Sequence, residues 1–172
     1  GRINIWNVHA FLALESVPAE EVEQSVERHL TVTKFSADQS VAAGPFHVLP
    51  AMLLLCRWEE ELSERAVSII KKFFLEGVID RGNTENHWLM HYAGSLLAAE
   101  RWADEPVMWN GLSPAAVRAE ASRWILGMID RSVMVGHHEY DSTGYVAEHV
   151  APLIALAEFT ADETIREKAR NM

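Results

Sequence analysis

The chain has 172 residues, of which 49% are hydrophobic and 23% are charged, and its formal net charge is −10. These values are typical of a globular domain with a core and exclude a disordered or low-complexity chain. The acidic balance argues against nucleic acid as a partner, although a local pocket can carry the opposite sign and bind an anionic ligand. The longest apolar run, residues 51–56, is far shorter than a membrane span, so no membrane partner is expected.

The first residues show no signal peptide, and the single cysteine limits the disulfide and metal chemistry of the chain. Gly1-Arg2-Ile3-Asn4 lacks the apolar segment and cleavage site of a signal peptide, and without a starting Met we expect a segment of a longer protein. Cys56 lies in the apolar run, where a buried and unreactive thiol is expected. One cysteine excludes an internal disulfide and a Cys-x-x-Cys metal site.

Helical periodicity runs through nearly the whole chain. Ser16 before Pro18 and an acidic first turn predict a helix start, and Gly44-Pro45 interrupts before a buried helix over 46–58 with an early Pro50. Residues 132–135 are the one stretch with possible strand character. Further helices are predicted over 60–78, over 85–102, from the Ser113-Pro114 cap onward, over 143–160 with Pro152 inside, and from 161 towards the C-terminus.

This pattern predicts an all-α fold of six or seven helices joined by short loops. Several helices are apolar enough to be covered on more than one side, as in an (α/α) toroid or partial toroid of antiparallel helical hairpins, with inner and outer helices. We therefore expect residues 1–172 to form one all-helical domain that is a fragment of a larger (α/α) toroid.

Polar side chains gather at the start of the helix predicted over 85–102. Asn86 and His87 are adjacent hydrogen-bonding groups at a helix start, which favours binding of an anion. The alternative to a binding site is a purely structural helix start, in which Thr84 or Asn83 accepts hydrogen bonds from the backbone N–H groups. His87 and His91 share a helix face and could bind zinc, but the His-Glu-x-x-His pattern is absent, so no metal site is predicted and His91 is expected in the core.

A second polar cluster occupies residues 136–145, which hold two of the chain's three tyrosines and two of its eight histidines. Such density in a loop is a functional hint, and the alternative is a solvated loop in which Tyr145 anchors the next helix. Tyr145 and His149 are four residues apart and are expected to face one space. Four tryptophans are predicted to lie in the core, with one or two as stacking platforms if the site binds carbohydrate: Trp88, Trp102, Trp109 and Trp124.

Taken together, the two clusters resemble a known arrangement. Asn86-His87 at a helix start, followed 58 residues after His87 by Tyr145 in an acidic segment that leads into an apolar helix, resembles the helical toroid domain of polysaccharide lyases. The heparinase II/III-like and oligoalginate lyases are the most similar in pattern. The resemblance covers roughly residues 45–170. This chain has Gly136-His137-His138 where the family often has Asp-Gly, and it lacks the β-sandwich domain that follows the toroid in those enzymes.

The resemblance implies β-elimination on a uronic-acid-containing polysaccharide or oligosaccharide, without a cofactor. Asn86 and His87 would neutralise the sugar carboxylate, and Tyr145 would act as general acid or base. Because a tyrosine pKa is ordinarily about 10, a nearby cation must lower it. The resemblance also implies a secreted or periplasmic location. Supporting roles in charge and orientation are assigned to Arg81, His138 and His149, and to Glu85 or Glu139.

Two other functions remain open from the sequence. A glycoside hydrolase of the same architecture would use two carboxylates, such as those of Glu85 and Asp141. A non-catalytic helical module would bind carbohydrate or serve as a scaffold within a larger protein.

Overall fold

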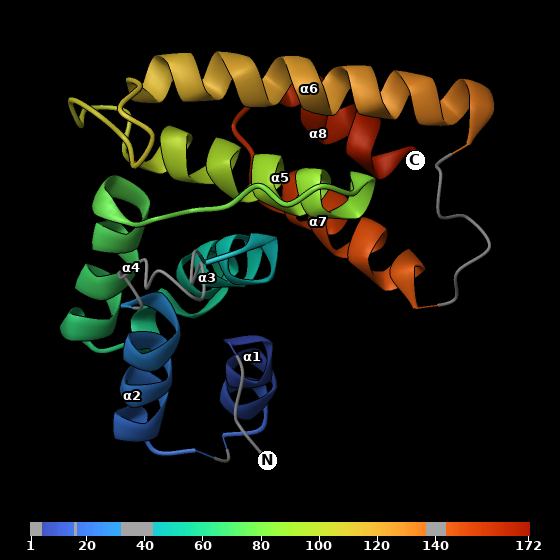
Figure 1. Ribbon diagram of the computed structural model, residues 1–172. Coiled ribbons are helices and arrows are strands. Elements are labelled where there is room, and N and C mark those ends of the chain that lie inside the picture. The colour runs from blue at the N-terminus through green and yellow to red at the C-terminus, as the bar shows by residue number, and fades with distance from the viewer. Residues whose placement is uncertain (1–4, 16, 32–42, 137–143) are drawn as a thin grey trace.

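The computed structural model describes residues 5–15, 17–31, 43–136 and 144–172 (Figure 1). Within these ranges the all-α prediction is confirmed, and the only β contact is an isolated bridge between Ala43 and Ile79. None of the described helices has the length and apolarity that a membrane crossing needs. The helices are α1 (Ile5–Ala13), α2 (Ala19–Leu30), α3 (Pro45–Trp58), α4 (Glu64–Glu76), α5 (Glu85–Arg101), α6 (Pro114–Val135), α7 (Tyr145–Phe159) and α8 (Glu163–Arg170), with a 3₁₀ turn at Glu59–Glu61.

Most predicted helices occur close to their predicted positions, and the differences have local causes. The segment over 60–78 is divided, because the Ser63 side chain accepts a hydrogen bond from the backbone N–H of Ala66 and starts α4 there. The possible strand at 132–135 was wrong: these residues form the last turn of α6, which ends at Gly136 with a φ of 77°. Pro18, rather than Ser16, directly precedes α2, and α1 was not predicted.

Helix α5 lies at the centre of the fold and packs against α3, α6 and α7 (Figure 1). Its residues from Leu89 to Ala99 are all buried, which explains why this stretch shows no single apolar face. Gly94 allows α3 to approach, because a Cβ at this position would lie 2.8 Å from Val48 Cγ1. The ring of inner and outer helices that defines a toroid stays a prediction.

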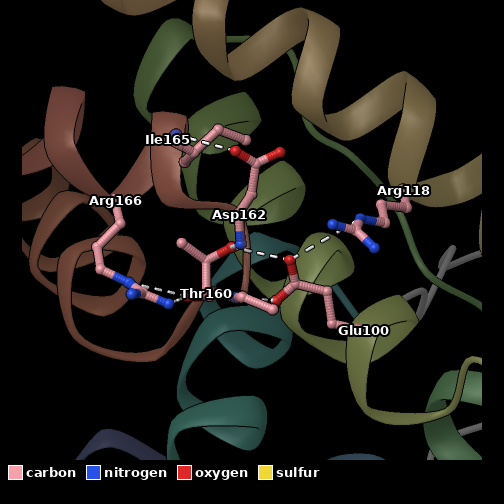
Figure 2. Close-up of polar contacts among 7 residues, drawn as sticks. Glu100, Arg118, Thr160, Asp162, Ile165 and Arg166 are labelled. Carbon is pink, nitrogen blue, oxygen red and sulfur yellow. Dashed lines mark hydrogen bonds and ion pairs between the residues drawn. The ribbon is translucent and has the colours of Figure 1, made fainter.

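Glu100, near the C-terminal end of α5, joins this helix to the turn between α7 and α8 (Figure 2). Its carboxylate accepts hydrogen bonds from Thr160 Oγ1 and from the backbone N–H of Ala161, both at 2.9 Å. Arg118, near the start of α6, lies 4.0 Å from the same carboxylate. Since the end of α5 meets the start of α6, the two helices run antiparallel, and this network fixes one end of their contact.

Candidate functional site

An open cleft of about 630 Å³ lies along the contact between α5 and α6, a volume within the usual range for small-molecule sites. The lining residues of α5 itself, Glu85, Trp88 and Tyr92, are spaced three and four residues apart, so they project from one side of the helix. Antiparallel packing places them opposite a similarly spaced row on α6. The cleft is lined by Asn83, Thr84, Glu85, Trp88, Tyr92, Glu120, Arg123, Trp124, Gly127, Met128 and Arg131.

Three aromatic rings form the middle of the cleft wall. Tyr92 stacks on Trp124 with ring centroids 4.9 Å apart, and Trp88 meets Trp124 edge to face at 6.0 Å. Trp88 Nε1 donates a hydrogen bond to the Gly82 carbonyl at 2.9 Å. Both tryptophans are half-buried, so they pack against the core and also line the cleft.

A hydrogen-bonded chain connects Arg81, Tyr92 and Glu120 beside these rings. The Tyr92 hydroxyl donates to Glu120 Oε1 at 3.0 Å and accepts from Arg81 Nη1 at 3.2 Å. Burial raises the pKa of Tyr92, and the Glu120 carboxylate adds to this rise while Arg81 opposes it. Tyr92 is therefore protonated at neutral pH. Arg81, to which the resemblance assigns a supporting charge, lies over the Trp88 ring at 4.2 Å and outside the lining of the cleft.

Glu85 connects three helices at the other end of the cleft. Its side chain is only 9% exposed and forms an ion pair with Arg131 of α6. His149 Nε2 of α7, whose side chain is 5% exposed, lies 3.8 Å from Glu85 Oε2. His149 Nδ1 lies 3.1 Å from the Tyr145 carbonyl, and because a carbonyl only accepts, Nδ1 carries the proton. His149 therefore contacts the Glu85 carboxylate and the Tyr145 backbone carbonyl, whereas the prediction concerned the side chains of Tyr145 and His149.

The predicted pair Asn86 and His87 does not line the cleft. Asn86 is fully buried, and its Oδ1 accepts a hydrogen bond from Thr84 Oγ1 at 2.7 Å. His87 packs edge to face against Phe46 of α3, at 5.2 Å between ring centroids. Successive helix residues differ in direction by about 100°, so these two side chains leave α5 on faces other than that of Glu85. The structural role of Thr84 is confirmed, because it caps α5 through the backbone N–H of His87.

The tyrosine segment is described only from residue 144 onward. Tyr145 is the first residue of α7 and its side chain is 45% exposed, outside the lining of the cleft. His138, Glu139 and Asp141 lie outside the described residues, so their predicted roles stay predictions.

Four lining residues with polar chemistry were missed from the sequence: Tyr92, Glu120, Arg123 and Arg131. The signal for the three residues on α6 is their spacing, because positions 120, 123 and 131 fall on one side of the helix with Gly127 between the last two. Arginine and glutamate spaced in this way are also typical of a solvated helix face, so the pattern alone does not indicate a site.

His91 and Cys56 have the structural roles predicted for them. His91 is 8% exposed, and burial, with a contribution from Arg81, lowers its pKa to about 4. Burial raises the pKa of the Cys56 thiol to about 11, which makes it unreactive. Within the described ranges no group of three or more His, Cys, Asp or Glu side chains is placed to hold a metal ion.

Acidification should destabilise the fold through His91. Its pKa is depressed in the folded state, so its contribution to stability is complete above pH 6.5 and is lost as the pH falls towards about 4. Between pH 7.5 and 5 the loss should be about 2 kcal/mol. Urea denaturation of the wild type and His91→Leu at both pH values tests this. The expected result is a smaller pH dependence in the variant, and equal slopes would contradict it. His9 and His47, whose pKa values burial also lowers, are present in both proteins and serve as the internal reference.

Removal of the buried Glu85 carboxylate should also destabilise the fold. Glu85→Gln leaves the Arg131 and His149 side chains without their shared anion, and because Arg131 stays partly in contact with water, the expected loss is about 2 kcal/mol in the free energy of unfolding. Glu76→Gln, which breaks the exposed pair with Lys72, is the matched control and should change stability by less than about 1 kcal/mol. Similar losses of stability in the two variants would show that the Glu85–Arg131 ion pair stabilises the fold no more than an exposed pair does.

Comparisons of this chain with protein-family models, with curated proteins and with solved structures found no match. The resemblance to polysaccharide lyases therefore rests on the motifs quoted from the sequence.

Proposed function

We propose that the cleft between α5 and α6 binds an acidic oligosaccharide. The observation that supports this most strongly is the combination of half-buried indole rings with two arginines in one open cleft. Sugar rings present C–H surfaces that pack on aromatic faces, and uronic acids add a carboxylate that a guanidinium binds through two hydrogen bonds. The rings of Trp88 and Trp124 would pack against the sugar C–H surfaces, and Arg123 and Arg131 would bind the carboxylates.

Arg123 is the better placed of the two arginines to recognise a ligand carboxylate. It is exposed on α6 and takes part in none of the ion pairs found among the described residues. Arg131 is held by Glu85 and is thereby oriented along the cleft wall. A ligand carboxylate at Arg123 would gain charge-assisted hydrogen bonds without first displacing an internal partner.

β-Elimination on that oligosaccharide is a second candidate, which the protonated Tyr92 favours. Elimination needs a cation beside the sugar carboxylate, a base for the proton on the neighbouring carbon, and an acid that protonates the departing oxygen. In this cleft Arg123 would take the neutralising role predicted for Asn86 and His87. Tyr92 would be the acid, and the Glu120 carboxylate the base. A secreted or periplasmic location, which the resemblance implies, would suit such a substrate.

Arg123→Gln should weaken binding of a short oligouronate at least tenfold, because a charged hydrogen bond contributes roughly 1.5–3 kcal/mol. Isothermal titration calorimetry with an oligogalacturonate, and with a neutral oligosaccharide of equal length, measures this. Arg28→Gln makes the same charge change on exposed α2 and should leave the affinity unchanged. Equal binding of charged and neutral sugars by the wild type, or equal loss in the two variants, would overturn the proposal.

Elimination is tested separately by the ultraviolet absorbance of the unsaturated uronate that it creates. Turnover of the oligouronate with rising absorbance, lost in Tyr92→Phe but with binding retained, is the expected result. New reducing ends without absorbance would indicate hydrolysis by carboxylates such as Glu85 and Glu120. Binding without either product would leave a carbohydrate-binding module.

A further inference from the structure

An exposed glycine interrupts the polar stripe that α6 presents to the cleft. Gly127 is well inside this helix of 22 residues, where glycine is less stable than alanine because it loses more backbone freedom on folding. It lines the cleft one helical turn from Arg123 on one side and one turn from Arg131 on the other. A residue that weakens its own helix at such a position calls for a physical reason.

Neither the backbone conformation nor packing within the protein explains why residue 127 is a glycine. The φ angle of Gly127 lies outside the left-handed region that favours glycine, and a Cβ built at this residue would meet no atom within 4 Å. Gly94 in α5 is the opposite case, since its Cβ would lie 2.8 Å from Val48 Cγ1 and 3.1 Å from the Val48 carbonyl oxygen. The space next to Gly127 is part of the cleft. The absence of a side chain therefore leaves room for a ligand.

We infer that Gly127 is the position at which a ring of the bound acidic oligosaccharide lies against the α6 backbone, with acidic groups of the ligand directed to Arg123 and Arg131. This inference rests on the proposed function. The two arginines are eight residues apart, which corresponds to roughly 12 Å along the helix axis. A single acidic monosaccharide would reach only one of them well. The site therefore selects oligomers that carry acidic groups on more than one sugar, and Gly127 determines how closely the ligand approaches.

The test is a size series at Gly127, with stability and binding measured on the same proteins. Gly127→Ala should raise Tm by about 2–4 °C, because the helix gains propensity without a clash. It should also weaken binding of a uronate trimer, and Gly127→Leu should weaken it at least about tenfold. The affinity for the uronic acid monosaccharide should change less. Gly94→Ala should lower Tm, since its Cβ meets the backbone of α3.

Ala115→Leu is the matched control for added volume, because residue 115 is exposed in the first turn of α6 and does not line the cleft. It should leave the affinity for the trimer unchanged. If Gly127→Leu binds the trimer as tightly as the wild type, the inference is overturned while the proposed function stands. If Gly127→Ala lowers Tm, the glycine has a structural role and the inference also fails. If the wild type binds neither trimer nor monomer, the proposed function itself fails.

Discussion

The burial of α5 is the constraint on which the rest of the structure depends. Helices α3, α6 and α7 cover most of its surface, so several polar groups near its N-terminus pair with groups inside the protein. Glu85 finds Arg131 and His149, Asn86 finds Thr84, and Tyr92 finds Glu120. These pairings determine how α6 and α7 dock on α5. The polar start of α5 is therefore first a packing requirement, and only the side facing α6 is open to a ligand.

The cleft follows from how large and small residues are arranged on the two antiparallel helices. Trp88, Tyr92 and Trp124 fill the middle of the contact with stacked and edge-to-face rings. Next to them, the α6 surface drops to the bare backbone at Gly127. Pairing bulky rings with a missing side chain leaves a hollow that is apolar on one wall and charged along its rim. Ligand sites commonly combine an apolar wall with a few convergent polar groups.

Helix positions could be predicted from the sequence because periodicity and caps are local signals. Thr84 and Ser113, both considered as caps from the sequence, accept a backbone hydrogen bond at the start of a helix, and Ser63, which was not considered, does the same at the start of α4. The strand suggestion at 132–135 failed because a local preference for branched residues gave way to a helix already in progress. The functional site was harder to predict than the helices. Density of polar residues pointed to Glu85 and His149, but which neighbour covers each face of α5 depends on contacts between residues far apart in the chain. Neighbouring positions such as 85, 86 and 87 therefore reached different environments.

The charges of the cleft bear on how a chain of net charge −10 would hold the proposed anionic ligand. Glu85 pairs with Arg131 and orients it along the cleft, and the Glu120 carboxylate accepts a hydrogen bond from Tyr92. The cleft lining carries as many guanidinium groups as carboxylates, two of each, and Arg81 behind Trp88 adds one positive charge beside it. At physiological salt, charges beyond about 8 Å are largely screened, so the acidic surface contributes little repulsion inside the cleft. Recognition of an acidic sugar would then depend on short-range hydrogen bonds and stacking rather than on long-range attraction, which favours specificity over speed of association.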